Sequence, residues 1–223
     1  MIVSILRLSQ FTIMPVFITA ALSFGTLVQA HPHNWIALNS SFVLDDRARL
    51  VQVNQRWEFD FYYSLMTHAD LLKQYGNEEL GLRATAADMI KNLESYQYFS
   101  TLKLNGSPIE LGVPDEYQLS TMNVEGQLIL VLEMTFDIET ETKIENKTLS
   151  WQVYDPTYYI AMNHATEKNI KIISGNATEC STKLELPQPT DDQIDYAQSL
   201  DQTQNNTDGL GASFAETAFI NCI

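Results

Sequence analysis

The chain is poor in positive charge. Its 223 residues include 13 Lys and Arg against 28 Asp and Glu, which gives a formal net charge of −15 at pH 7. A chain this acidic lacks the basic surface that binds nucleic acid, and an anionic membrane surface would repel it. We therefore expect neither a nucleic-acid partner nor direct binding to an anionic bilayer.

Motifs for catalysis and for cofactor binding are also missing. The sequence has no HExxH zinc motif, no GxSxG nucleophile elbow, no phosphate-binding P-loop and no GxGxxG dinucleotide motif. No arrangement of its Ser, His and Asp residues stands above chance as a hydrolase triad. We therefore expect a protein that is not an enzyme.

Cysteine occurs only at Cys180 and Cys222. Neither has the close Cys or His neighbours that a zinc site requires. An even number of cysteines in an exported chain favours a disulfide, and the alternative is a pair of unpaired buried thiols. The bridge would close a loop of about 43 residues, worth roughly 4 kcal/mol in the chain-entropy model.

The sequence has a single long apolar run, which lies near the N-terminus. Residues 11–27 carry no charge, Arg7 precedes them, and Val28 and Ala30 suit the −3 and −1 positions of a signal-peptidase site. We predict a cleaved signal peptide at 1–30 and a single periplasmic domain at 31–223. The alternative is an uncleaved anchor, although this run is short against the ~20 residues that span a bilayer.

Much of the predicted mature chain has the two-residue period of β-strands. Residues 34–60 indicate a hairpin turning at Asp45-Asp46, with Val51, Val53, Trp57 and Phe59 on one face of its second strand. Similar patterns predict strands at 101–105, 108–113, 127–138, 148–154, 157–163 and 169–174.

Two helices in series interrupt this β-rich pattern. Residues 62–75 place Leu65, Ala69 and Leu72 on one helical stripe before a stop at Gly76, and residues 78–98 repeat the helical period. A short helix is predicted at 190–200, and the last apolar piece is either a strand or a helix fixed by Cys222. The predicted fold class is α+β, an antiparallel β-sandwich-like body with an inserted helical hairpin.

The predicted mature N-terminus offers the best arrangement of metal ligands. His31 would supply its free α-amine and imidazole Nδ1 as a chelate, and His33 a third nitrogen. Such nitrogen ligands suit Cu(II), Ni(II), Co(II) or Zn(II). Pro32 excludes the N-terminal copper/nickel chelate that uses deprotonated amides, because proline has no amide hydrogen. The remaining ligands would therefore come from the folded body.

Candidates to complete a metal site are His68, His164, Asp60 and Asp155. Each also has a structural interpretation. Asp60 stands where it would cap the first helix, and Asp155 precedes a proline and suits a turn. His68 lies on the flank of a helix and His164 at the end of a strand. We take His31, His33, Asp60, Asp155 and His164 as the predicted metal ligands.

Four segments resemble a known family. They are H-P-H-N-W-I (31–36), R-W-E-F-D-F-Y-Y-S (56–64), N-L-E-S-Y-Q-Y-F (92–99) and V-Y-D-P-T-Y-Y-I (153–160), with a tail that contains the two cysteines. In this order they resemble the domain of unknown function 1007 family, the periplasmic component of an uncharacterised ABC-type transport system. The resemblance implies association with nickel/cobalt-efflux-type permeases, and it covers His31, His33, Asp60 and Asp155 as motif positions.

We therefore expect an exported, monomeric accessory protein that binds or delivers one nickel, cobalt, zinc or copper ion for an inner-membrane permease. The chain lacks the His-rich loop of many metal-transport accessory proteins, which argues against high-capacity chelation. One alternative is an assembly module that docks on a permease without binding metal. Another is a copper oxidase that uses its N-terminal histidine.

Overall fold

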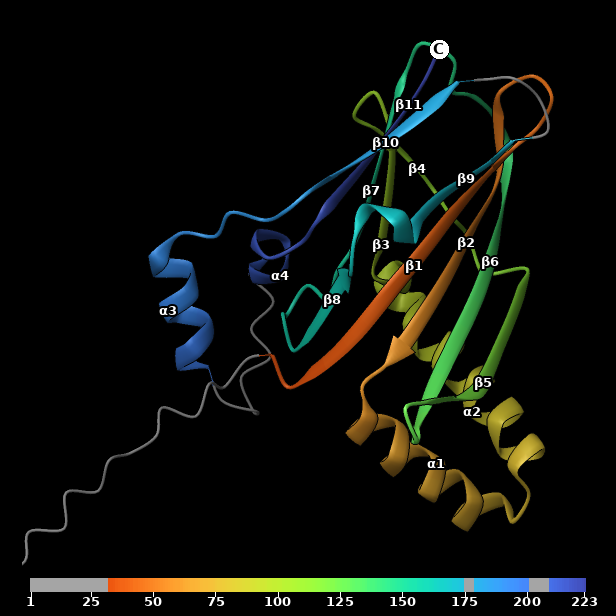
Figure 1. Cartoon of the computed structure of the whole chain (residues 1–223), viewed down its shortest axis with the longest axis vertical. Coiled ribbons are helices and arrows are strands. Elements are labelled where there is room, and N and C mark those ends of the chain that lie inside the picture. The colour runs from red at the N-terminus through yellow and green to blue at the C-terminus, as the bar shows by residue number, and fades with distance from the viewer. Residues whose placement is uncertain (1–31, 175–178, 201–208) are drawn as a thin grey trace, which may run out of the picture.

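A computed structural model of the chain describes residues 32–174, 179–200 and 209–223 (Figure 1). The N-terminal segment and His31 lie outside these residues. The described part forms two packed β-sheets with a helical hairpin inserted after the first two strands, as the sequence predicted. None of its helices combines the length and the hydrophobicity needed to cross a membrane.

The first sheet has six strands. Its order is β5 (Glu116–Val124), β6 (Gln127–Lys143), β2 (Arg49–Phe59) and β1 (Asn34–Leu44), followed by β8 (Ile160–His164) and β9 (Ile170–Ser174). Both of these last strands pair with β1 in parallel, separated by the short helix η2 (Glu167–Asn169). The predicted antiparallel body therefore contains one parallel edge, which local patterns cannot show.

The second sheet has five strands. Its order is β10 (Cys180–Glu185), β11 (Thr217–Cys222), β7 (Thr148–Val153), β3 (Ser100–Leu104) and β4 (Ser107–Ile109), all antiparallel. The predicted disulfide between Cys180 and Cys222 is present and joins β10 to β11. The last apolar piece of the chain is therefore a strand.

The β1–β2 hairpin turns where the sequence predicted, around Asp45. The Asp45 carboxylate accepts hydrogen bonds from the backbone amides of Arg47 and Arg49, each at 2.9 Å. The Arg49 side chain also donates to it at 2.7 Å, and this bond lowers the pKa of Asp45 to about 2. Val51 departs from the predicted alternation and is exposed, because the pairing of β2 with β6 shifts register between Leu50 and Gln52.

Large apolar side chains from both sheets fill the space between them. The biggest fully buried residues include Trp57 and Phe42 from the first sheet and Trp151 from the second. Phe42 and Trp151 pack edge to face, with ring centroids 5.8 Å apart. Buried aromatic residues of this size contribute much of the stability of a sandwich core.

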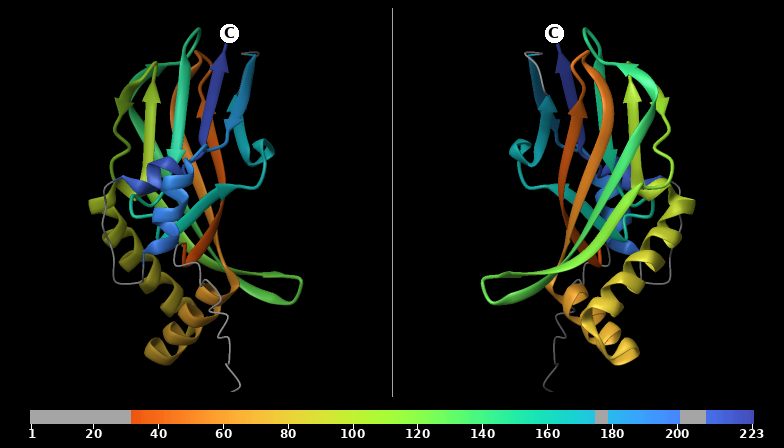
Figure 2. Two further views of the ribbon diagram at one scale, coloured as in Figure 1. Left: turned by 90° about the vertical axis from the view of Figure 1, so that its left-hand side faces the viewer. Right: turned by 90° about the vertical axis from the view of Figure 1, so that its right-hand side faces the viewer.

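The helical hairpin consists of α1 (Phe61–Tyr75) and α2 (Glu78–Leu93). Figure 2 shows the two helices beyond the lower end of the second sheet, against the part of the long strands that this sheet leaves uncovered. Ala86 and Ile90 of α2 belong to the main hydrophobic core. The hairpin therefore completes the core at this end of the molecule.

The second predicted helix ends earlier than expected. α2 stops at Leu93, and a 3-10 segment, η1 (Glu94–Phe99), follows it. Within η1 the backbone of Gln97, Tyr98 and Phe99 is left-handed, with φ of 51°, 53° and 55°. This conformation is costly for residues other than glycine, and it turns the chain sharply into β3.

Two short helices lie beside the sandwich. α3 (Asp191–Ser199) corresponds to the predicted helix at 190–200, and α4 (Leu210–Ser213) precedes β11. They share a small apolar cluster in which Leu200 and Leu210 are buried. The rings of Tyr158 and Phe214 stack against this cluster with centroids 4.0 Å apart. A second, minor core thus joins the C-terminal part to the loop before β8.

Candidate functional site

His33 is the first predicted ligand within the described residues, and it lies against the loop before β8. Its amide donates a hydrogen bond to the carbonyl of Tyr159 at 2.9 Å, and the two rings lie 4.7 Å apart. The parallel pairing of β1 with β8 begins one residue later, at Asn34. The backbone of His33 is therefore fixed, while the predicted chelate of His31 stays a prediction.

Asp60 lies between β2 and α1 in the chain, and its side chain links β1 to the start of α1. One carboxylate oxygen accepts from the amide of Tyr63 at 2.9 Å and caps the helix, and the other accepts from the amide of Trp35 at 3.2 Å. The Asp60 amide returns a bond to the carbonyl of Trp35 at 3.0 Å. The carboxylate thus performs the structural role that the sequence offered as the alternative to metal binding.

Asp155 closes the turn between β7 and β8 and is 5% exposed. Its carboxylate accepts hydrogen bonds from the backbone and side chain of Thr157 at 2.9 and 2.8 Å and from the amide of Ile160 at 3.1 Å. Gly211 of α4 packs so closely that an added Cβ would lie 1.9 Å from the Asp155 carbonyl oxygen. Asp155 therefore holds a tight, buried turn.

His164 lies in a chain of buried hydrogen bonds that sequence reasoning missed. Trp151 Nε1 donates to Ser40 Oγ at 3.0 Å, and Ser40 Oγ lies 2.9 Å from His164 Nε2. On the other side of the ring, His164 Nδ1 lies 3.3 Å from Glu216 Oε2, which also accepts from the His164 amide at 2.7 Å. An ionised carboxylate only accepts, so Glu216 favours the N–H at Nδ1 of His164, and in that tautomer Nε2 accepts from the Ser40 hydroxyl.

The order serine, histidine, carboxylate is that of a hydrolase triad. Here, however, Ser40 is 3% exposed, His164 6% and Glu216 8%. A substrate carbonyl has no approach to a serine at this depth, and its hydroxyl is held between an indole and an imidazole. We interpret the group as a structural network that ties β1, β7 and β8 to the segment before β11.

The predicted ligands do not converge on a common point within the described residues. Over residues 32–174, 179–200 and 209–223, no three His, Cys, Asp or Glu side chains gather into a group that could hold a metal ion. His68 is paired with Glu78, 3.0 Å away, and so links α1 to α2. The fold thus places Asp60, Asp155 and His164 in three separate structural contacts.

The four family-like segments nevertheless meet at one end of the sandwich. His33 bonds to Tyr159 and Trp35 to Asp60, as described above, and the amide of Tyr154 donates to the carbonyl of Phe99 at 2.8 Å. These contacts join segments that are far apart in the sequence. The residues that carry the resemblance therefore form one junction, from which the helical hairpin projects (Figure 1).

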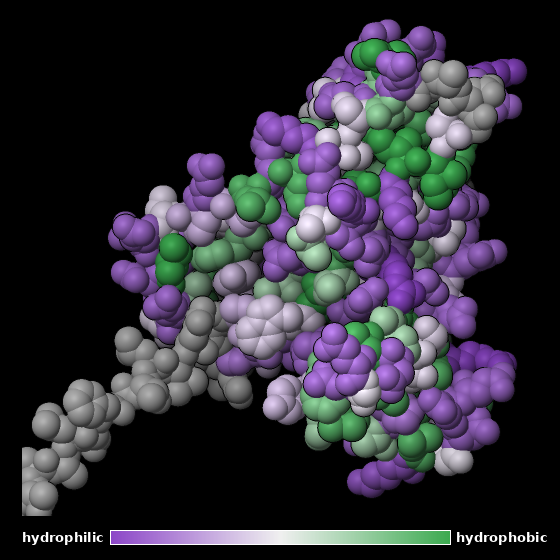
Figure 3. Space-filling view, viewed as in Figure 1, coloured by the Kyte–Doolittle hydropathy of each residue, from purple (hydrophilic) through white to green (hydrophobic). Residues whose placement is uncertain are grey.

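The outer surface of α1 carries a stripe of apolar residues beside the exposed polar residues Asp70, Lys73 and Gln74. We use the name α1 stripe for Tyr62, Leu65, Met66, Ala69 and Leu72, all of which are exposed. Tyr62 is 78% exposed and Met66 64%. Figure 3 shows apolar residues among polar ones at this lower end of the molecule.

The face of α1 that packs on the sheet is instead built around a serine. Ser64 is fully buried, and its hydroxyl accepts from the amide of Leu130 in β6 at 2.9 Å. Leu71 is the other buried residue of this helix. The stripe that the sequence showed at Leu65, Ala69 and Leu72 therefore faces away from the core, which an amphipathic pattern alone does not reveal.

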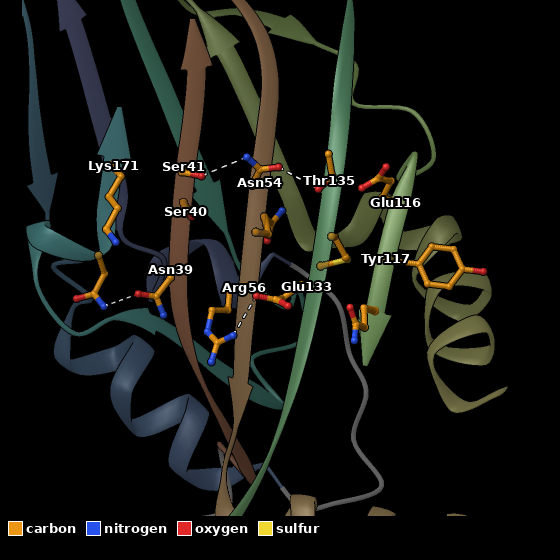
Figure 4. Close-up of a pocket in the computed structure, with 14 residues that line it drawn as sticks. Asn39, Ser40, Ser41, Asn54, Arg56, Glu116, Tyr117, Glu133, Thr135 and Lys171 are labelled. Atoms are coloured by element: carbon orange, nitrogen blue, oxygen red, sulfur yellow. Dashed lines mark hydrogen bonds and ion pairs between the residues drawn. The ribbon is translucent and has the colours of Figure 1, made fainter. Parts of the chain in front are cut away.

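The outer face of the first sheet carries a shallow polar hollow of about 470 Å³ (Figure 4). Strand register aligns its side chains in two rows across the strands. One row is Lys171, Ser41, Asn54, Thr135 and Glu116, and the other is Asn39, Arg56, Glu133 and Gln118.

Neighbouring side chains in these rows hydrogen-bond one another. Thr135 donates to Asn54 at 2.9 Å, and Arg56 pairs with Glu58 and Glu133 at 3.0 Å each. The described lining residues include no histidine or cysteine. We interpret the hollow as the solvent-facing side of an antiparallel sheet.

The described residues define a two-sheet α+β body with an inserted helical hairpin. Comparison with known proteins gives the family: the model of DUF1007, "Protein of unknown function", matches residues 16–222, and the chain belongs to this family. An uncharacterised protein of Haemophilus influenzae is 32% identical over 210 residues, which cover 90% of this chain and 94% of that protein. No solved structure matches the chain.

Proposed function

We propose that the chain is an exported, non-catalytic accessory protein of a transition-metal transport system and that it docks on an inner-membrane permease through α1. The exposed α1 stripe is the observation that carries this proposal. Apolar side chains gathered on one exposed helix face mark a surface that another protein covers.

The position of α1 supports a membrane partner. Its first turn adjoins Trp35, which is 54% exposed, through the Asp60 contacts. Trp35 is the second residue of β1, so the first strand begins beside α1, and in the sequence it follows the apolar segment 11–27. A permease helix is therefore the occupant that we assign to the stripe. The proposal that the transported ion is a transition metal rests on the family resemblance.

The docking proposal is tested by co-purification with a coexpressed nickel/cobalt-efflux-type permease. We expect a chain with Leu65→Glu and Met66→Glu to lose the permease, because two carboxylates would enter an apolar contact. The matched control is Ile173→Glu, since Ile173 is also an exposed apolar residue, at 51%, but lies on β9. Equal recovery of the permease with both variants would contradict the proposal.

Metal binding at the mature N-terminus is a second candidate function. It is supported by the hydrogen-bonded backbone of His33, a predicted ligand that follows His31 by two residues in the sequence. Titration calorimetry with nickel, cobalt, copper or zinc chloride should give one ion per chain. Adding one residue before His31 should abolish this affinity, because the free amine moves away from the imidazole. Equal affinity in the extended chain would exclude the chelate.

A further inference from the structure

β5 forms an open edge of the first sheet. Within the described residues it pairs with β6 alone, and no hydrogen bond involves the backbone groups that point away from β6 between Tyr117 and Thr121. In an antiparallel pair, alternate residues direct their amides and carbonyls away from the neighbour. Figure 4 shows β5 as the last strand, with Tyr117 directed beyond the edge. This edge is a template for another strand.

Other sheet edges in the described part of the chain are protected in ways that β5 is not. β4 has three residues and contains Pro108. β10 carries the Lys183–Glu185 ion pair and the disulfide. β8 and β9 have five residues each and are interrupted by η2. β5 runs for nine residues, EYQLSTMNV, without lysine or proline.

A groove of about 580 Å³ lies between β5 and α2. Its wall on the helix is formed by Glu78, Glu79, Leu82, Arg83 and Ala86, and its wall on the strand by the five consecutive residues 117–121. The hydroxyl of Thr121 donates to Glu78 at 3.4 Å and crosses one end of the groove. An open strand edge beside a helix provides backbone partners on one side and side-chain contacts on the other.

We propose that this groove binds an extended, basic segment of another protein, which adds to β5 as a further strand. Main-chain hydrogen bonds to β5 would supply the affinity, and an apolar side chain of the segment would rest on the half-buried Leu82. Glu78 and Glu79 line the groove and Glu116 begins β5. The one lysine or arginine among the described lining residues is Arg83, which is paired with Glu79 at 2.8 Å. The uncompensated charge is negative, which selects a basic segment.

A second copy of the chain fits this edge poorly. β5 contains Glu116 and no cation, so pairing β5 with itself would bring no opposite charges together. The net charge of −15 also opposes self-association. The α1 stripe lies on a different helix from the groove. The tests of permease docking and of strand addition can therefore give different results.

Panning of a phage-displayed library of random nine-residue peptides against the full chain tests the proposal. We expect enriched peptides that carry Lys or Arg and β-branched residues. When bound, they should slow amide hydrogen exchange in residues 117–121. N-methylation of one alternate set of amides in the selected peptide should abolish binding, while methylation of the other set leaves it intact. Sensitivity to both sets or to neither would overturn strand addition.

Charge is tested with two variants. Glu79→Lys should weaken binding of the selected peptide about tenfold through loss of electrostatic complementarity. Asp46→Lys makes the same change in charge at the exposed β1–β2 turn and should leave affinity unchanged. Failure to enrich any peptide, equal effects of the two variants, or sedimentation showing a dimer that peptide dissociates would each overturn the proposal.

Discussion

Ser40 and Ser41 are neighbours in β1 whose side chains lie on opposite faces of the first sheet. Ser40 is buried between Trp151 and His164, whereas Ser41 accepts one bond from Asn54 at 3.3 Å on the solvent side. Two adjacent serines are therefore expected to contribute differently to the free energy of unfolding. Buried polar groups are costly when a partner is removed, and exposed ones are replaced by water.

We expect Ser40→Ala to lower the free energy of unfolding by about 1–3 kcal/mol, because it leaves the Trp151 N–H and His164 Nε2 without partners. Ser41→Ala is the control and should change it by less than about 0.5 kcal/mol. Urea unfolding with the disulfide intact measures both. Equal effects would show that the buried network adds nothing to stability.

At the scale of elements, the left-handed turn in η1 sets how α2 connects to β3. Gln97 is exposed and has φ 51° and ψ 39°, a conformation that glycine adopts without penalty. Tyr98, the next residue, is 2% exposed, and burial raises the pKa of its hydroxyl. Strain at Gln97 is therefore tolerated because the adjacent ring is anchored in the core.

Gln97→Gly should raise the free energy of unfolding by about 0.5–1 kcal/mol, since relief of left-handed strain exceeds the added entropy of the unfolded chain. The control is Gln74→Gly in the regular helix α1, which should lower it by about 1 kcal/mol. Thermal unfolding of the two variants should shift in opposite directions. Destabilisation by both would mean that the turn is not strained.

Most elements could be predicted from the sequence because their periods are local. The β1–β2 hairpin, α1 and the start of β6 follow alternation, caps and stops. β5 was missed because EYQLSTMNV does not alternate, and β10 was missed at the polar end of the chain. The parallel pairing of β1 with β8 and β9 depends on long-range register.

The candidate site was less accessible to sequence reasoning. The structural alternatives for Asp60 and Asp155, a cap and a turn, followed from their neighbours and agree with the observed contacts. The partners of His164 could not be inferred from its neighbours in the sequence, because Ser40 and Glu216 come from distant parts of the chain. Likewise, burial of Ser64 rather than Leu65 depends on the amide of Leu130, which no helical pattern encodes.

At the scale of the whole molecule, the disulfide fixes one edge of the second sheet at the end opposite the hairpin (Figure 1). It links residues 42 positions apart, and the enclosed loop includes α3 and α4. The chain-entropy model assigns such a loop a stabilisation of about 4 kcal/mol.

Reduction should therefore lower the free energy of unfolding by about 4 kcal/mol, and urea unfolding with and without a phosphine reductant measures the difference. The variant with both Cys180→Ser and Cys222→Ser should match the reduced protein and be insensitive to the reductant. A reductant effect that persists in this variant would exclude the disulfide as its cause.

The parallel partners of β1 also have a consequence for the path of folding. The β1–β2 hairpin can form early, since its strands adjoin in sequence, but the other side of β1 stays open until β8 and β9 have been added to the chain. Contacts of such large sequence separation form slowly. During that interval one edge of β1 is unpaired, and an open strand edge favours aggregation of newly made chains until residue 174 is in place.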